Sequence, residues 1–276
     1  NPALDMPDIR ALADIAHEHH IPLVVDSTFT PPALYRPMED GADIVIHSLS
    51  KWIGGHGAAM GGVVIDSGKF DWKASNVPLF TEPDANYHGL RWAQDLPAEL
   101  APIAFALRFR TVPLRNLGAC LSPDNAWIFL IGCETLHVRM ERHSQNGLAA
   151  AKFLKNHPEV AWVRYPGLEE DPAYPVAKKQ LKNGSGGMVV FGIKAGNGQT
   201  ATERGRQFIE HLKLFSHVSN VGDAKSLATH PASTTHSQMS EEEQRASGLQ
   251  PELVRLSIGI EHIDDILGDL EQALAR

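Results

Sequence analysis

Lys51 follows an apolar segment, in a setting that favours a reactive amine. Asp43–Ile46 has strand character, Ser48 and Ser50 precede the lysine at alternate positions, and a glycine-rich turn, Gly54–Gly57, follows it. An isolated lysine is usually a surface residue. A lysine that leaves a hydrophobic strand for a polar pocket is instead partly desolvated, which lowers the pKa of its amine and makes the amine nucleophilic. This segment therefore predicts a catalytic lysine.

Asp26 ends a second apolar run, Leu23–Val25, and completes a recognisable pair with Lys51. A lysine and a carboxylate at the ends of neighbouring strands are what a pyridoxal phosphate site requires. The lysine holds the aldehyde as a Schiff base, and the carboxylate keeps the pyridine nitrogen protonated, so that the ring accepts electrons. From the residues alone, a turn or helix-capping role for Asp26 is equally open.

The elements around this pair indicate an α/β domain. An amphipathic helix over Pro7–His19 precedes strands at Ile21–Val25, Asp43–Ile46 and Gly62–Ile65. The strands are apolar throughout rather than alternating, which is typical of a parallel sheet covered by helices. Ligands bind beyond the carboxyl ends of such strands, where the aspartate and the lysine both lie.

The rest of the chain predicts a smaller second domain. Residues 66–121 are irregular and rich in aromatic side chains, and Pro123 begins a long helix that runs to about Asn146. We expect the large domain over 1–145 and a small α+β domain with an antiparallel sheet over 146–276. The elements expected there are helix Leu148–His157, strands Val160–Tyr165 and Gly187–Ile193, helix Thr202–Leu212, strand Leu253–Ile258 and helix Ile263–Ala275.

Four separated motifs resemble one enzyme family along essentially the whole chain. They are Val25–Phe29, His47–Gly57, His230–His236 and Val254–Glu261. They are similar to those of the Cys/Met-metabolism pyridoxal phosphate enzymes of fold type I. The resemblance implies an α/β fold type I transferase with a mostly parallel sheet covered by helices and a smaller C-terminal α+β domain.

The resemblance also implies cofactor contacts for pyridoxal 5'-phosphate. These are Lys51 as Schiff base and proton shuttle, Asp26 at the pyridine nitrogen, Thr28 near the ring, Ser48 and Ser50 at the phosphate, and Asn1 near the phenolic oxygen. The two serines are two residues apart, so in an extended strand they share one face. Without the resemblance, serines bonded to the backbone at a sheet edge are the preferred interpretation.

Two further residues are implied to bind the substrate. Arg255 matches the family arginine that binds the α-carboxylate, because its guanidinium makes two parallel hydrogen bonds to a planar carboxylate. The alternative for Arg255 is a surface ion pair with Glu252 or Glu261. Asn220 lies in a segment that matches the family less clearly, and it is expected to help hold the same carboxylate.

The long insertion over residues 66–123, together with the segment Asn220–Leu227, looks like the O-acetylhomoserine sulfhydrylase branch of the family. This implies γ-replacement on O-acetyl-L-homoserine with sulfide, which gives L-homocysteine and acetate in methionine biosynthesis. Cystathionine γ-synthase and methionine γ-lyase activities remain alternatives that use the same residues. A non-catalytic chain that only assembles with partners is an alternative of another class.

Composition narrows the other classes of function. The chain has 276 residues and a net charge of −8, so we expect no nucleic-acid partner. No apolar run approaches the length of a membrane span, so none is expected. The two cysteines favour a reducing, cytoplasmic location. The histidines lack metal-ligand spacing, so no metal site is expected. Gly54–Gly57 lacks the strand and helix context of a dinucleotide site.

Asn1–Pro2 matches a stretch that lies deep inside the large domain of the resembled family. We therefore expect this chain to be the C-terminal two-thirds of such an enzyme, with the N-terminal part upstream or on a companion chain. That part is expected to hold further cofactor ligands, so this chain alone is expected to be inactive. The resemblance also implies a homo-oligomer, a dimer of dimers.

Overall fold

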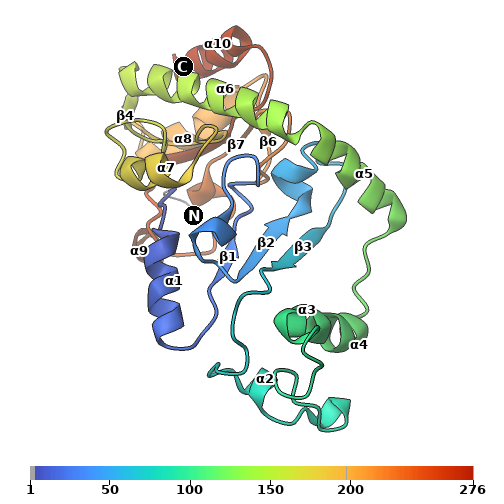
Figure 1. Ribbon diagram of the computed structural model, residues 1–276. Coiled ribbons are helices and arrows are strands. Elements are labelled where there is room, and N and C mark those ends of the chain that lie inside the picture. Colours follow the sequence, from blue (N-terminus) through green and yellow to red (C-terminus); the bar gives the residue numbers. More distant parts are fainter. Residues whose placement is uncertain (1–3, 197, 276) are drawn as a thin grey trace.

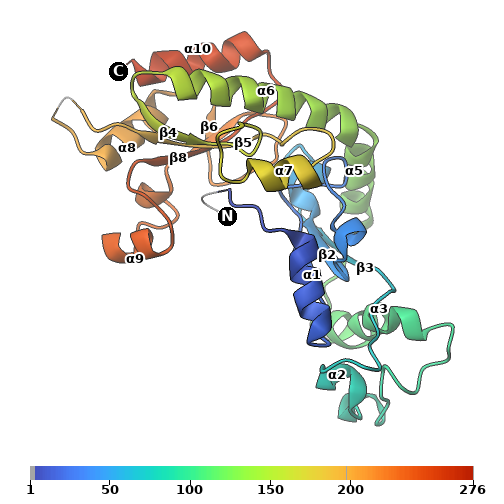
Figure 2. The same cartoon turned by 60° about the vertical axis from the view of Figure 1, so that its left-hand side comes forward.

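The computed structural model describes residues 4–196 and 198–275, so the expected cofactor contact Asn1 lies outside the described residues. Two sheets, one of three and one of five strands, make up the β-structure of these residues. Helix α6 (Leu136–Asn156) runs across the second sheet and reaches the first through α5 (Pro123–Glu134) (Figures 1 and 2).

The first sheet carries the strands expected to position the reactive amine, in the order β1-β2-β3. They are β1 (Val24–Asp26), β2 (Ile44–Ser48) and β3 (Gly62–Asp66). Strands β1 and β2 are parallel, with Asp26 opposite Ile46, so both end at the same edge. Strand β3 is antiparallel to β2. The parallel direction expected for this strand was wrong, since an apolar run carries no information about direction.

Helix α1 (Ile9–Glu18) covers this sheet as its amphipathic pattern predicts. The Asp8 side chain accepts a hydrogen bond from the Ala11 N–H at 3.2 Å and caps the first turn. Ile9 packs in one cluster with Val45 of β2. The helix therefore fixes the position of β2, which leads into Lys51.

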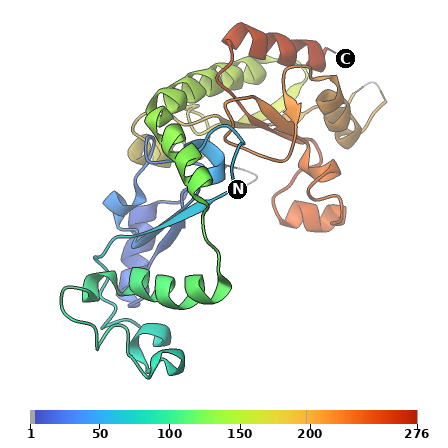
Figure 3. The same cartoon turned by 90° about the vertical axis from the view of Figure 1, so that its right-hand side faces the viewer.

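The aromatic segment after β3 forms short helices around a core of its own. The rings of Trp72 and Phe80 lie 4.1 Å apart between centroids, within a buried cluster that includes Trp92. This part lies at the end of the molecule away from the second sheet (Figures 1 and 3). Its helices and turns are α2 (Pro78–Thr81), η3 (Ala85–Tyr87), η4 (Ala101–Ile103), α3 (Ala104–Phe109), η5 (Arg110–Leu114) and α4 (Arg115–Leu117).

The long helix expected over 123–146 is two helices, α5 (Pro123–Glu134) and α6 (Leu136–Asn156). The Ser122 hydroxyl caps α5 by accepting from the Asn125 N–H at 3.2 Å. Thr135 separates the helices, and α6 absorbs the separate helix expected at Leu148–His157. The domain boundary near residue 145 therefore falls inside a continuous helix, and its position stays a prediction.

The second sheet has the order β4-β5-β8-β7-β6. Its pairs are antiparallel, as expected, except that β6 and β7 are parallel. Three of its strands match those expected from the sequence, whereas β6 and β7, which are only two and three residues long, were not expected. The strands are β4 (Val160–Arg164), β5 (Met188–Ile193), β6 (Ser216–His217), β7 (Leu227–Thr229) and β8 (Leu253–Ser257).

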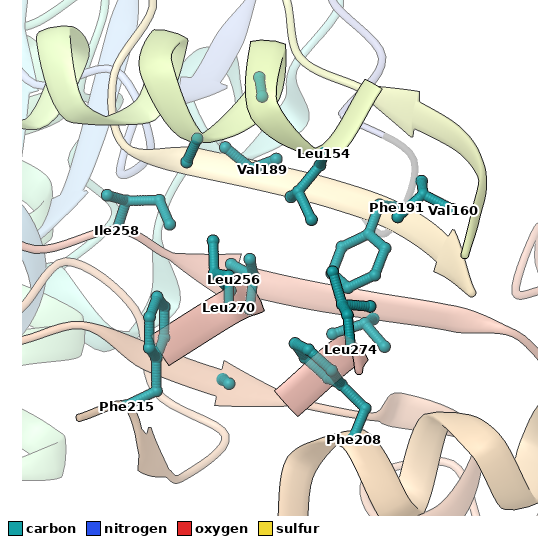
Figure 4. Packing of buried hydrophobic residues seen from close by; sticks show 14 of the residues in the cluster. Leu154, Val160, Val189, Phe191, Phe208, Phe215, Leu256, Ile258, Leu270 and Leu274 are labelled. Carbon is teal, nitrogen blue, oxygen red and sulfur yellow. The ribbon is translucent and has the colours of Figure 1, made fainter. Parts of the chain in front are cut away.

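One face of this sheet forms the largest apolar cluster. Alternate residues of β8, Val254 and Leu256, belong to it. Figure 4 shows Leu256 among Leu154 of α6, Phe208 of α8 (Ala201–His211) and Leu270 of α10 (Ile263–Leu274). The other residues of β8 face the first sheet.

The remaining helices and turns are η1 (Pro37–Asp40), α7 (Tyr174–Gln180), α8 (Ala201–His211), η6 (Pro231–Ser233), α9 (Glu241–Ala246) and α10 (Ile263–Leu274). Among the described residues, no helix is both long enough and apolar enough to cross a membrane.

Candidate active site

Lys51 lies just beyond the end of β2, in the wide helical turn η2 (Leu49–Ile53). The turn departs from helical geometry at Lys51 itself, where φ is −94° and ψ is −131°. The Lys51 amine donates a hydrogen bond to Oδ1 of Asn220, a residue 169 positions later in the chain. The structure therefore brings together two residues that the sequence assigned separately to catalysis and to substrate binding.

The electrostatic surroundings of Lys51 favour its neutral form. Burial lowers the pKa of the Lys51 amine, and the positive charge of Arg255 lowers that pKa further. Burial penalises the ammonium because it loses hydration, and a nearby cation repels it. A larger fraction of the amine is therefore unprotonated and nucleophilic than for an exposed lysine.

A cavity of about 570 Å³ opens beside the carboxyl ends of β1 and β2. Its lining includes Asp26, Thr28, Ser48 and Lys51, all of them expected site residues. The opposite wall comes from the segment before α1 and from the segment that leads into β5. The cavity thus lies where the sequence placed the ligand, beyond the ends of the two parallel strands.

Asp26 makes the turn contact that the sequence left open, and its role at a pyridine nitrogen stays a prediction. Its Oδ1 accepts a hydrogen bond from the Thr28 N–H at 3.0 Å, which is a turn contact. The same side chain lines the cavity. The Thr28 hydroxyl in turn accepts from the Ser48 N–H at 2.9 Å and joins the ends of β1 and β2.

The two serines do not share one face. Ser48 is the last residue of β2 and lines the cavity, whereas Ser50 lies in η2. The Ser50 hydroxyl accepts from the Gly61 N–H at 3.0 Å and reaches the Gly61 carbonyl at 3.4 Å. The assumption of an extended strand through Ser50 was therefore wrong, because the chain turns at residue 49. The phosphate contact expected of Ser50 stays a prediction.

Arg255 pairs with Thr229 of β7. Its neighbours Val254 and Leu256 enter the core and its charge acts on Lys51, so its side chain lies on the face of β8 that is turned toward the first sheet. Burial lowers the pKa of the Arg255 guanidinium. Within the described part of the chain, neither Glu252 nor Glu261 forms the alternative ion pair with it. Glu252 accepts from the Trp162 indole N–H at 3.1 Å, and Glu261 accepts from the Ser226 N–H and hydroxyl at 2.6 and 2.9 Å. A half-buried guanidinium in such a position suits an anionic ligand.

Gly222 was not identified from the sequence, yet it lets the loop of Asn220 reach Lys51. Its φ is +77°, and a Cβ atom there would lie 2.6 Å from the Trp52 nitrogen and 3.0 Å from the Lys51 carbonyl carbon. Its own N–H donates to the Ser257 hydroxyl at 3.0 Å. The sequence offered only the presence of a glycine in the segment Ser219–Asp223. It could not show that this glycine packs against the backbone of Lys51 and Trp52.

Comparison with known proteins identifies the family. The model of the family described as Cys/Met metabolism PLP-dependent enzyme matches residues 1–275. The chain belongs to this family. The enzymes of this family depend on pyridoxal phosphate, which confirms the cofactor expected from the sequence.

Individual relatives agree with the branch expected from the insertion. The chain is 50% identical to the O-acetyl-L-homoserine sulfhydrylase of Leptospira meyeri, over 99% of this chain and 62% of that protein. It is 47% identical to the homocysteine synthase of Schizosaccharomyces pombe, again over 99% and 62%. The chain thus spans about 62% of the length of these curated relatives.

A solved structure supports the fold. A protein of Campylobacter jejuni described as an O-acetylhomoserine (thiol)-lyase superposes with a TM-score of 0.91 at 40% identity, over 100% of this chain and 64% of that chain. That crystal structure contains N'-pyridoxyl-lysine-5'-monophosphate. The α/β fold type I architecture expected from the sequence is confirmed.

Proposed function

We propose that this protein catalyses γ-replacement on O-acetyl-L-homoserine with sulfide, giving L-homocysteine and acetate. One observation carries the proposal: the Lys51 amine, with its lowered pKa, lies between a cavity lined by Asp26 and the substrate-binding candidates Asn220 and Arg255. The names of relatives at 43–50% identity support the choice of reaction.

The donor set fits pyridoxal phosphate. Lys51 offers an amine that can bind an aldehyde, and the Asp26 carboxylate lines the same cavity, as pairing with a ring nitrogen requires. Ser48 adds a hydroxyl that suits a phosphate oxygen. When bound, the cofactor supplies an electron-accepting ring that stabilises negative charge at the substrate Cα.

Lys51 performs the proton transfers in this proposal. Its neutral amine takes the proton from the substrate Cα and releases it again, so that the same amine can take a second proton from Cβ. The acetate group then leaves from Cγ. Sulfide forms the new bond to Cγ, and Lys51 returns protons to the carbon skeleton. O-acetylhomoserine and hydrogen sulfide thus give homocysteine and acetic acid, with all atoms accounted for. The hydrogen bond to Asn220 holds the amine in place before substrate binds.

Arg255 and Asn220 orient the substrate. The guanidinium binds the α-carboxylate through two parallel hydrogen bonds. The Asn220 side chain, which accepts from Lys51, has an amide N–H₂ group left to donate to the same carboxylate. Substrate binding therefore brings a carboxylate next to the positive charge that lowers the pKa of Lys51.

The test uses the full-length protein, with the N-terminal part expected upstream or on a companion chain. This protein is loaded with pyridoxal phosphate and incubated with O-acetyl-L-homoserine and sulfide, and homocysteine is measured. Parallel reactions with O-acetyl-L-homoserine plus cysteine, and with methionine alone, measure cystathionine γ-synthase and methionine γ-lyase activity. We expect homocysteine production to be the fastest of the three. Faster formation of cystathionine, faster breakdown of methionine, or no product in any reaction contradicts the proposal.

We further propose that the enzyme works in the cytoplasm as a homo-oligomer, a dimer of dimers. Cys120 and Cys133 are both exposed and unpaired, which suits a reducing compartment. Trp127 and Leu130 of α5 expose 64% and 66% of their surface, and such apolar side chains favour assembly. Analytical ultracentrifugation measures the oligomeric state, and a monomer at micromolar concentration contradicts the assembly.

A further inference from the structure

Three buried polar side chains follow one face of α6: Arg139, His143 and Asn146. Their spacing of four and then three residues places them in one row along the helix. They are 5%, 0% and 2% exposed. Buried polar groups need hydrogen-bond partners, and each of these three side chains donates to at least one main-chain carbonyl beside the candidate site.

Arg139 holds the turn that carries Lys51. Its Nη1 donates to the Trp52 carbonyl at 2.7 Å, and its Nη2 donates to the Ile53 carbonyl at 3.0 Å. Nη2 also donates to the Gly132 carbonyl in α5 at 2.7 Å. The guanidinium packs against Gly55 so closely that a side chain at that position would overlap it. The two residues after Lys51 are therefore fixed to α6.

His143 bridges the two sides. Its ring meets the Trp52 ring edge-to-face, with centroids 4.8 Å apart and planes at 82°. Its Nδ1 donates to the Ile258 carbonyl at 2.7 Å, just past the end of β8. One side chain thus contacts both the residue after Lys51 and the strand that carries Arg255.

Asn146 holds the end of β8. Its amide nitrogen donates to the carbonyls of Gly259 and Glu261, both at 3.0 Å. These residues follow Arg255 by four and six positions. Asn146 therefore holds the backbone that follows Arg255, just as Arg139 holds the backbone that follows Lys51.

We propose that α6 sets the spacing between Lys51 and Arg255, with Arg139, His143 and Asn146 as the positioning residues. A helix rises about 1.5 Å per residue and resists stretching, so the row from Arg139 to Asn146 is a spacer of roughly 10 Å. The inference rests on the proposed roles of Lys51 and Arg255. The three side chains act through the backbone that carries those two.

The test compares Arg139→Lys and Asn146→Ala with a control on the exposed face of the same helix, Arg142→Lys. A lysine at position 139 cannot reach three carbonyls with one nitrogen, and an alanine at position 146 removes both donors. The readout is the pH dependence of chemical labelling of Lys51 in the cofactor-free protein, followed by mass spectrometry. Unfolding temperature and kcat/KM of the loaded enzyme are measured in parallel.

If the turn that carries Lys51 or the end of β8 is displaced, Arg255 moves away from Lys51 or the amine becomes exposed to water. We expect the labelling midpoint to move to higher pH in both variants, and kcat/KM to fall about 100-fold, as for a displacement of about 1 Å. The control is expected to match the wild type. A variant that is less stable but keeps the wild-type midpoint and kcat/KM shows a structural role only and overturns the inference.

The two proposals fail in different ways. The labelling experiment needs no cofactor, so it tests the spacing even if the reaction is misassigned. A wild-type protein that forms no homocysteine contradicts the proposed function, whereas unchanged labelling in the variants contradicts the role of α6. Should Arg139→Lys not fold, Asn146→Ala decides the question by the same readout.

Discussion

At the scale of single residues, burial and a neighbouring charge act on Lys51 in the same direction. Both lower the pKa of the amine, burial more than the charge of Arg255. The Asn220 oxygen accepts a hydrogen bond from the amine and keeps it pointed at the site. A lysine prepared in this way reacts with a carbonyl group at a lower pH than an exposed lysine does.

Replacing Lys51 by alanine is expected to abolish the visible absorbance of the lysine-bound cofactor. It is also expected to lower homocysteine production by at least about 1,000-fold, because a positioned acid–base group contributes roughly 100- to 10,000-fold. Absorbance spectra and steady-state kinetics measure the two effects. Lys152→Ala, at an exposed position on α6, is the control. A Lys51→Ala protein that keeps the absorbance band removes Lys51 as the cofactor-binding residue.

Two substitutions of Arg255 separate its charge from its shape. In Arg255→Gln the positive charge is lost, so the pKa of the Lys51 amine rises and labelling of that amine shifts to higher pH. In Arg255→Lys the charge remains, so the shift is smaller. Both variants lose the two parallel hydrogen bonds to a carboxylate, and KM for the amino acid rises roughly 10- to 100-fold. Equal labelling of wild type and Arg255→Gln would falsify the electrostatic coupling.

At the scale of elements, strand β8 serves the core and the site at once. Val254 and Leu256 enter the core, whereas Arg255 and Ser257 face the first sheet. Because side chains alternate along a strand, a slip of one residue would exchange the two sets. The core therefore fixes which side Arg255 faces.

The loop between β6 and β7 gives a prediction about backbone space. Gly222→Ala adds the cost of a left-handed residue, about 1–2 kcal/mol, to that of overpacking against Trp52, about 1–3 kcal/mol. Gly248→Ala is the matched control: its φ is +81°, and the added carbon meets nothing within 4 Å. Denaturant unfolding and kinetics check both variants. We expect only Gly222→Ala to lose activity, and equal activities contradict a role for this contact.

Much of the site was predictable because chemistry and hydrophobic pattern coincide there. Apolar runs end at Asp26 and shortly before Lys51, and the structure brings both to one cavity. The place of Ser50 was mispredicted because nothing in the sequence marks the turn after Ser48. Arg139 was missed because its partners are main-chain carbonyls of distant residues, which a sequence does not reveal.

At the scale of the whole molecule, the site forms where two sheets meet. The cavity opens at the ends of β1 and β2, while Arg255 comes from β8 of the second sheet. Figures 1 and 2 show α6 lying over the second sheet and continuing through α5 toward the first. The relative position of the sheets therefore determines whether the site is complete.

His143 links the stability of the molecule to pH. Burial lowers the pKa of His143 from 6.5 to about 4 in the folded protein. Between these values the unfolded chain binds the proton more readily than the folded one, so stability falls as the pH drops from 6.5 to 4. The full effect is roughly 3 kcal/mol.

Denaturant unfolding at several pH values measures this dependence. In His143→Gln the amide still donates to the Ile258 carbonyl, but the titrating group is gone, so the loss of stability between pH 6.5 and 4 becomes smaller. His137→Gln, at an exposed position on the same helix, is expected to keep the wild-type dependence. Identical pH profiles for the two variants show that His143 is not the group responsible.

The separation of 169 residues between Lys51 and Asn220 has a consequence for the newly made protein. A ribosome adds about 5–20 residues per second, so roughly 10 to 30 seconds pass between the synthesis of these two residues. During that time neither Asn220 nor Arg255 exists, and the amine has no partner from the second sheet. The Lys51 amine therefore reaches its full reactivity toward carbonyl compounds only after the C-terminal half of the chain has folded onto it.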